Sequence, residues 1–282
     1  MTGAVGTAGP GASGPPASDP PASPIGRLES ALRGRRDAGH KLLIPYVTAG
    51  MDDQWLLTVE GLAGAGADAI EVGIPFSDPM IDGPTIQEAS LRALDRGVTP
   101  EGILADLRQL DVDVPLVVMT YYNLIERAGH TRIAGNLAAS GVSGAIIPDL
   151  PLEELGPWAD AAGAAGIDTV LLVAPSTPDD RIGEICGRCH GFVYAVGRMG
   201  VTGEQVELAG SAREVAGRIT TVTDLPVCVG IGVSTPEQAV TVCEVADGVV
   251  VGSALVRRLL EGEGPDGAAA FVSSLRHALD VG

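Results

Sequence analysis

Two carboxylates stand close together in this chain, one inside an apolar run and one on the loop behind it. Residues 69–87 read AIEVGIPFSDPMIDGPTIQ, in which Glu71 interrupts the apolar run and Asp82 follows on a loop stiffened by proline and glycine. A carboxylate in an apolar strand is costly unless it is hydrogen-bonded or used in chemistry. Barrel and sheet enzymes place catalytic groups at strand ends and on the loops behind them. The pair suggests proton transfer, although a lone Glu71 is more simply a buried acid paired with a basic residue.

Glycine-rich loops follow three of the later apolar runs. They are GRMGVTG at 197–203, GIGVS at 230–234 and VGSALV at 251–256, where Gly252 and Ser253 open a short helical pattern. Backbone N–H groups exposed by glycine, together with a helix N-terminus, bind an anion without any basic side chain. One such glycine is more simply a turn residue, but three sets predict a phosphate site opposite the carboxylates. The expected substrate is phosphorylated and undergoes proton transfer at its other end.

Cysteine and histidine spacing predicts neither a disulfide framework nor a metal site. Cys186 to His190 spell C-x-x-C-H, a haem-attachment pattern that belongs to exported proteins, and no second ligand pair stands at a usable spacing. Cys186 and Cys189 are interpreted as packing residues. The four histidines are expected at the surface or in structural roles.

These groups are positioned by a repeated unit, in which a short β-branched run ends at a loop and a helical pattern follows. The predicted strands are 42–48, 69–74, 115–121, 144–148, 169–174, 191–197, 226–231 and 248–252. The predicted helices are 25–38, 54–66, 85–95, 100–109, 131–140, 153–165, 178–187, 209–221, 235–245 and 266–279. Strands that are apolar on both faces and alternate with helices indicate a parallel sheet.

Eight such units in about 250 residues match an α/β fold of the (β/α)8 TIM-barrel type. An open, doubly wound sheet is the structural alternative. Helix 25–38 is an extra N-terminal element that is expected to cap the barrel. Residues 1–24 are almost entirely Gly, Pro, Ala, Ser and Thr, which predicts a disordered tail ahead of a single catalytic domain at 25–282.

Composition excludes several kinds of partner. With 36 acidic against 18 basic residues, the formal net charge is −18, which argues against nucleic acid and against an anionic membrane surface. The apolar runs are too short to span a bilayer, and no export signal opens the chain. We therefore expect a cytoplasmic protein.

At this point the motifs carry a specific resemblance to the tryptophan synthase alpha-chain family, the indole-3-glycerol-phosphate lyases. Its core is E-x-G-I-P-F-S-D-P-x-x-D-G-P-T-I-Q at 71–87. Supporting motifs are PYVTAG at 45–50, Y-x-N at 121–123, PDLPLEE at 148–154, R-x-G-V-T-G at 198–203, GIGVS at 230–234 and VGSA at 251–254. The resemblance runs from about Leu28 to the C-terminus.

The resemblance implies a lyase of tryptophan biosynthesis that splits indole-3-glycerol phosphate into indole and glyceraldehyde 3-phosphate by a retro-aldol step. Glu71 would be the general acid/base at the indole carbon and the side-chain hydroxyl, and Asp82 would accept the indole N–H. An apolar strand end should raise the pKa of Glu71, whereas Asp82 on a wetter loop should stay ionised. The remaining implied contacts are Tyr121 and Tyr194 near the substrate, Thr202 holding Asp82 on loop closure, and Gly203, Gly232, Gly252 and Ser253 at the phosphate.

The resemblance also implies a partner. A tryptophan synthase beta chain would hold pyridoxal phosphate, leaving no cofactor in this chain, and would contact the loop around Asp78 and Pro79 in an alpha2beta2 tetramer. Three alternatives stay open: a stand-alone lyase that releases free indole, a non-catalytic activator of a beta chain, and a different phosphate-binding barrel enzyme such as a sugar-phosphate isomerase.

Overall fold

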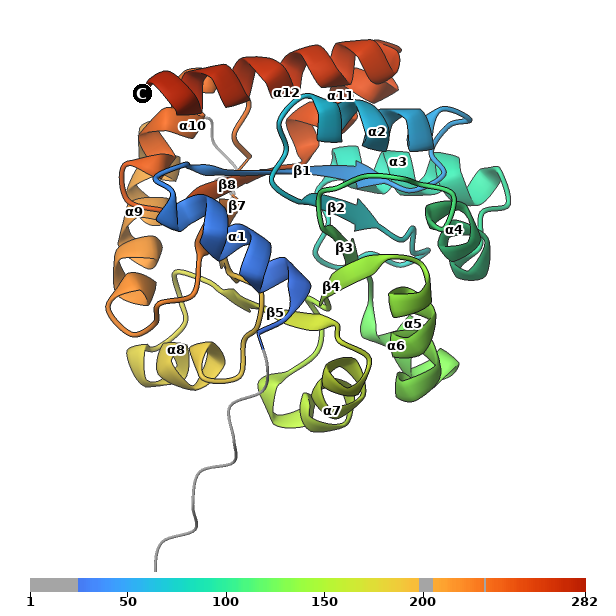
Figure 1. The fold of residues 1–282 in the computed structure, drawn as a ribbon, viewed down its shortest axis with the longest axis horizontal. Helices are drawn as coiled ribbons and strands as arrows, with labels where there is room; N and C mark the ends of the chain where they lie inside the picture. The colour runs from blue at the N-terminus through green and yellow to red at the C-terminus, as the bar shows by residue number, and fades with distance from the viewer. Residues whose placement is uncertain (1–24, 198–204, 231) are drawn as a thin grey trace, which may run out of the picture.

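Eight parallel strands close into a barrel in the order of the sequence (Figure 1). The computed structural model describes residues 25–197, 205–230 and 232–282. The strands are β1 Leu42–Thr48, β2 Ile70–Gly73, β3 Leu116–Met119, β4 Val142–Ile146, β5 Asp168–Val173, β6 Val193–Val196, β7 Val227–Gly230 and β8 Gly248–Val251. Strand β8 pairs with β1, which closes the sheet. The TIM barrel predicted from the sequence is confirmed, and the open sheet is wrong.

Helices surround the barrel and return the chain from the end of each strand to the start of the next. They are α1 Arg27–Asp37, α2 Trp55–Gly64, α3 Pro84–Asp95, α4 Pro100–Leu107, α5 Tyr122–Ala128, α6 His130–Ala139, α7 Gly156–Ala164, α8 Asp179–Cys186, α9 Gln205–Thr220, α10 Pro236–Cys243, α11 Ser253–Leu260 and α12 Gly264–Val281, with a short 3₁₀ turn η1 at Leu152–Glu154. Within the described residues, no helix has the length and apolar character needed to cross a bilayer.

Helix α5 is the element that the sequence analysis missed. Its seven residues are too few to show a helical period, and Gly129 separates it from α6 with φ +86, a backbone conformation that suits glycine. The predicted helix at 153–165 is likewise divided, because η1 precedes α7 and Pro157 stands in the first turn of α7. The predicted tail at 1–24 lies outside the described residues.

The barrel interior is filled by alternate residues of the strands, and α1 covers its N-terminal end (Figure 1). Leu28 and Leu32 of α1 are fully buried in one cluster with inward-facing strand residues. These strand residues are Leu42, Ile44, Ala69, Val117, Ile146, Val170, Phe192, Cys228 and Val250. The first helix therefore caps the barrel, as predicted.

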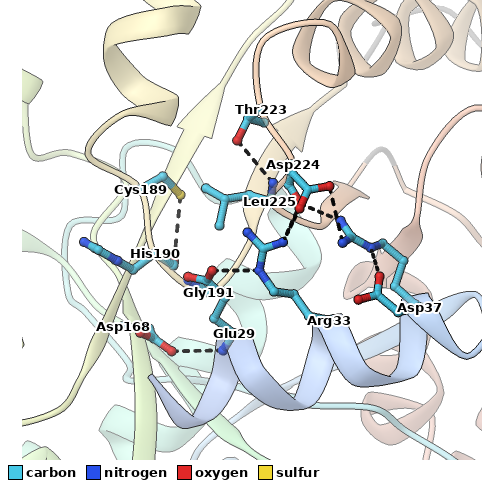
Figure 2. Close-up of polar contacts among 11 residues, drawn as sticks. Glu29, Arg33, Asp37, Asp168, Cys189, His190, Gly191, Thr223, Asp224 and Leu225 are labelled. Carbon is cyan, nitrogen blue, oxygen red and sulfur yellow. Dashed lines mark hydrogen bonds and ion pairs between the residues drawn. The ribbon is translucent and has the colours of Figure 1, made fainter. Parts of the chain in front are cut away.

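A polar network fixes α1 against the base of the barrel (Figure 2). Asp168 of β5 accepts a hydrogen bond from the Glu29 backbone N–H at 3.0 Å and so caps the first turn of α1. Gly26, the residue before that turn, has no side chain for this purpose, and a Cβ there would lie 2.0 Å from an oxygen of Asp168. The cap of this helix is thus supplied from 139 residues away.

The Glu29 carboxylate is fully engaged in the same network. Its Oε1 pairs with Arg33 Nε at 2.8 Å, and its Oε2 accepts from the Gly191 backbone N–H at 3.2 Å. Glu29, Asp168 and His190 bring potential metal ligands within 4.8 Å of one another. Because N–H donors already occupy the carboxylate oxygens, we assign this group to capping the helix.

All four cysteines are buried and free. Cys189 donates to the backbone oxygen of Phe192 at 3.1 Å, and burial raises the pKa of its thiol. A buried thiol with a raised pKa is a poor nucleophile and a poor metal ligand. The interpretation of Cys186 and Cys189 as packing residues is confirmed.

Candidate active site

A cavity of about 180 Å³ opens at the C-terminal ends of the strands. Six of the residues predicted for the site line it, from β2, β6 and the loops after β2, β7 and β8. They are Glu71, Asp82, Tyr194, Gly232, Gly252 and Ser253. Residues far apart in sequence thus meet at the end of the barrel where enzymes of this fold carry out their chemistry.

Glu71 is the most deeply buried acid of this cavity, with 1% of its surface exposed. Its Oε2 has no hydrogen-bond partner among the described residues, and no lysine or arginine of that part of the chain forms an ion pair with it. Burial, followed by the nearby charge of Asp82, raises its pKa to about 8. The simpler interpretation, a buried acid paired with a basic residue, therefore finds no support.

Asp82 lies on the loop between β2 and α3 and is half-buried. Burial raises the pKa of its carboxyl group, and a hydrogen bond with Tyr121 opposes that rise. The loop is held from both sides, since Gln87 Nε2 donates to the Asp82 backbone oxygen at 2.8 Å and Ile81 N–H donates to Tyr121 Oη at 3.3 Å. Asp82 is therefore less exposed to solvent than its place on a loop predicts.

Tyr121 holds this loop and does not line the cavity. It is buried directly after β3, and its ring stacks on Phe76 with centroids 4.9 Å apart. Its hydroxyl reaches the backbone of Ile81, next to Asp82. The structure thus brings Tyr121 to the site but gives it a positioning contact.

Two tyrosines cross the barrel mouth over glycines of neighbouring strands. A Cβ at Gly73 would lie 2.0 Å from Tyr46 Oη, and a Cβ at Gly230 would lie 2.4 Å from Tyr194 Oη. Only glycine leaves room for these rings to lie across the sheet. Tyr46 was not singled out from the sequence, although it follows Leu42 and Ile44 at the two-residue spacing of inward-facing positions.

Backbone groups from the loops after β7 and β8 also line the cavity. Gly232 has φ +81, a conformation that L side chains rarely adopt, and Gly252 directly precedes helix α11, which Ser253 begins. A helix N-terminus with free N–H groups attracts an anion. Thr202 and Gly203, the other two predicted contacts, lie outside the described residues.

Much of the remaining cavity wall is apolar. Its residues, none of which was predicted, are Ile86, Met119, Ile146, Pro148, Leu172, Val196 and Val250. The strand alternation could have identified Met119, Ile146, Leu172 and Val250, since each stands at an inward-facing position close to a strand end. The cavity can therefore hold a molecule with an apolar body, an anionic end and a centre that exchanges protons.

Comparison with known proteins assigns the same region of sequence to one family. A family model described as "Tryptophan synthase alpha chain" matches residues 32–277. A tryptophan synthase alpha chain of Halorhodospira halophila is 44% identical over 267 residues, which cover 90% of this chain and 96% of that protein. One from Picosynechococcus sp. is 46% identical over 257 residues, covering 88% and 97%.

Solved structures agree with the sequence relatives. A structure of Mycobacterium tuberculosis tryptophan synthase contains a chain that is 38% identical and superposes with a TM-score of 0.85, covering 92% of this chain and 100% of that one. A tryptophan synthase alpha chain from Legionella pneumophila is 32% identical with a TM-score of 0.81, covering 91% and 98%. Sequence and fold thus point to the same relatives over nearly the whole described barrel.

Proposed function

This chain belongs to the tryptophan synthase alpha-chain family, and from that premise we propose that it cleaves indole-3-glycerol phosphate into indole and glyceraldehyde 3-phosphate in tryptophan biosynthesis. The observation that carries the proposal is Glu71, a buried carboxyl group with a raised pKa that shares a cavity with Asp82. The apolar wall suits an indole ring, and the glycine loops suit a phosphate. The reaction makes this chain a carbon–carbon lyase acting from a single catalytic domain, residues 25–282.

Glu71 is the proton donor and acceptor of the proposed reaction. With its pKa near 8, the free carboxyl group is largely protonated at neutral pH and can protonate the indole ring carbon that bears the side chain. The resulting carboxylate then takes the proton of the adjacent side-chain hydroxyl. As that oxygen becomes the aldehyde carbonyl, the carbon–carbon bond breaks and its electrons restore the aromatic ring, so Glu71 ends the cycle protonated.

Asp82 stabilises the positive charge that protonation places on the ring. Its carboxylate accepts the indole N–H, and the attraction is strongest while the ring is cationic, which favours the transition state over the bound substrate. Tyr121 and Gln87 hold the loop that carries Asp82, so the carboxylate is oriented before substrate arrives. In the proposed closed state Thr202 contacts Asp82.

The phosphate binds at the glycine loops. Gly252 and Ser253 at the start of α11, and Gly232 on the loop after β7, are proposed to donate backbone N–H groups, with Gly203 completing the set. Tyr194 lines the same cavity and is proposed to contact the substrate body. Binding energy gained at the phosphate fixes the ring at the carboxylates.

A tryptophan synthase beta chain is the proposed partner, in an alpha2beta2 tetramer whose beta chains hold pyridoxal phosphate and receive the indole. The loop around Asp78 and Pro79 supports this, because Met80 on that loop is 92% exposed and Ile81 is 51% exposed. Exposed apolar side chains next to an active site are suited to cover by another protein. We place the assembly in the cytoplasm.

The test is indole release from indole-3-glycerol phosphate by the purified chain, alone and with a tryptophan synthase beta chain added. Weak activity that rises steeply with the beta chain and disappears in Glu71→Gln is the expected result. Strong activity that does not change when the beta chain is added would indicate a stand-alone lyase. If the chain raised the activity of the beta chain but released no indole, it would be a non-catalytic partner. If it neither released indole nor activated the beta chain, the proposal would be contradicted.

A further inference from the structure

A second cavity lies outside the barrel, between the ends of β2 and β3 and helices α4, α5 and α6. We call it the outer pocket. It encloses about 490 Å³. Five of its lining side chains are aliphatic and buried, namely Ile74, Leu104, Ile125, Ile133 and Leu137, and polar side chains such as Thr99 and Asn136 complete the lining. Cavities of this size and lining are characteristic of small-molecule sites.

One buried hydroxyl group lines the outer pocket. Thr120 is 2% exposed, and its hydroxyl forms no hydrogen bond within the described part of the chain, although it lines the cavity. A buried hydroxyl without a partner costs free energy that a ligand atom can recover. The pocket therefore offers one hydrogen-bonding group deep among apolar walls.

The rim of the outer pocket is mainly cationic. Arg127 and Arg132 line it against a single carboxylate, Glu101. Neither arginine forms an ion pair among the described residues, and Arg132 uses only its Nε, which donates to Ala128 O at 2.6 Å. Guanidinium groups with free N–H donors bind carboxylates in charge-assisted pairs.

We propose that the outer pocket is a second small-molecule site, one that takes an apolar molecule bearing a single carboxylate. The aliphatic walls hold the body of the ligand, the Thr120 hydroxyl meets a polar atom at depth, and the two arginines receive the carboxylate. This site is separate from the active-site cavity and uses none of its residues.

The outer pocket is coupled to the active site through one strand. Met119 lines the active-site cavity, Thr120 lines the outer pocket, and Tyr121 bonds the backbone of Ile81 beside Asp82. These three consecutive residues place the two cavities on opposite faces of the end of β3. A ligand that orders Thr120 acts on the loop that carries Asp82.

Isoleucine methyl groups report on each cavity separately, so NMR of the ¹³C-methyl-labelled full chain tests the proposal. The probe is 3-phenylpropionate, with 3-phenylpropanamide as its neutral match, each titrated to about 10 mM because a ligand of this size reaches a Kd of roughly 1 mM. Ile74, Ile125 and Ile133 report on the outer pocket. Ile81, Ile86 and Ile146 all line the active-site cavity, so a shift at Ile81 reports coupling only while Ile86 and Ile146 stay unmoved.

The carboxylate is expected to shift the methyl signals of Ile74, Ile125 and Ile133, followed by Ile81 through the Tyr121 contact. The amide should bind about tenfold more weakly, the effect of one charge-assisted hydrogen bond. The double variant Arg127→Gln/Arg132→Gln should lose the preference for the acid over the amide. The control is Arg108→Gln, which changes an arginine at the C-terminal end of α4 that does not line the outer pocket, and this variant should retain the preference. Thr120→Val should weaken both ligands.

Three results would overturn the proposal. They are unmoved outer-pocket signals, shifts confined to Ile86 and Ile146, and equal affinities for the acid and the amide in the unaltered chain. Binding without any response at Ile81 would overturn the coupling to the active-site loop.

Discussion

Each end of the barrel holds a pair of carboxyl groups, and the two pairs differ in how they are hydrogen-bonded. At the base, Glu29 and Asp168 accept hydrogen bonds from backbone N–H groups and from Arg33. At the mouth, one oxygen of Glu71 has no hydrogen-bond partner among the described residues, and the pKa of this group is raised to about 8. Satisfied carboxylates fix structure, whereas an unsatisfied one is ready to exchange protons. The difference assigns stability to the base and chemistry to the mouth.

The cost of burial is visible at both ends. Burial raises the pKa of Asp168, and the hydrogen bond from the Glu29 backbone opposes this rise. No hydrogen bond from the described part of the chain lowers the pKa of Glu71, and the charge of Asp82 adds to the effect of burial. The mouth thus holds destabilising electrostatics that the rest of the barrel must offset, as is common at active sites.

The largest expected effect is on activity. Glu71→Gln keeps the shape of the side chain but removes its proton exchange, so indole release should fall by about 10²–10⁴-fold or more. The matched change at the base, Glu29→Gln, should leave turnover close to that of the unaltered chain, because no atom of Glu29 lines the cavity. Steady-state indole assays of both variants measure this. If both variants lost the same fraction of indole-releasing activity, the two ends of the barrel would not have the separate roles proposed for them.

Glu71 should also make stability depend on pH. Its pKa is about 8 in the folded chain against an ordinary value of 4.5, so the folded state binds more protons between these limits and its stability falls as pH rises through them. Glu71→Gln removes a penalty on the order of a few kcal/mol above pH 8. Urea unfolding of both proteins at about pH 5 and pH 9 checks this. A difference in stability that is the same at both pH values would contradict it.

A smaller effect is expected from the helix cap at the base. Asp168→Ala leaves N–H groups of the first turn of α1 without their acceptor and should cost about 0.5–2 kcal/mol of unfolding free energy. Activity should be retained, since the change is at the far end of the barrel from the cavity. Chemical denaturation and the indole assay, run on the same preparation, measure both. Lost activity in a fully folded Asp168→Ala chain would argue against separate roles.

The smallest effect belongs to the exposed part of the same network. Arg36 and Arg33 both pair with Asp224, whose side chain is 85% exposed. Exposed ion pairs contribute about 0–1 kcal/mol, so Arg36→Gln should change the free energy of unfolding by less than Asp168→Ala does. Salt should reduce the difference further. A larger loss than that of Asp168→Ala would show that the surface, and not the buried cap, holds α1.

The barrel fold could be predicted from the sequence because each of its strand–helix units has a local pattern and the pattern is repeated. Each strand is a short apolar run with a helix behind it, and Glu71 stands out in such a run. The glycine loops are visible for the same reason, and Gly232 does adopt the positive φ that favours glycine. Helix α5 was missed because seven residues carry too weak a period.

Contacts between distant residues could not be predicted in this way. Asp168 caps a helix that begins 139 residues earlier, and no pattern near either residue announces the contact. The contact of the Tyr121 hydroxyl with the loop of Asp82 is another example, because 40 residues separate Tyr121 from Ile81. The position of Tyr46 beside Glu71 follows from the pairing register of β1 and β2, which the sequence alone does not give. Side-chain direction at the barrel mouth follows from closure of the sheet and not from local sequence.

The pH dependence of kcat/KM for indole release tests the central claim most directly, because it reports the ionisation of the free enzyme. The protonated carboxyl group of Glu71 is required first, so activity should decline as pH rises past an apparent pKa near 8. A profile that stays flat well above pH 8, or that rises there, would show that the unpartnered carboxyl group at the mouth is not the proton donor.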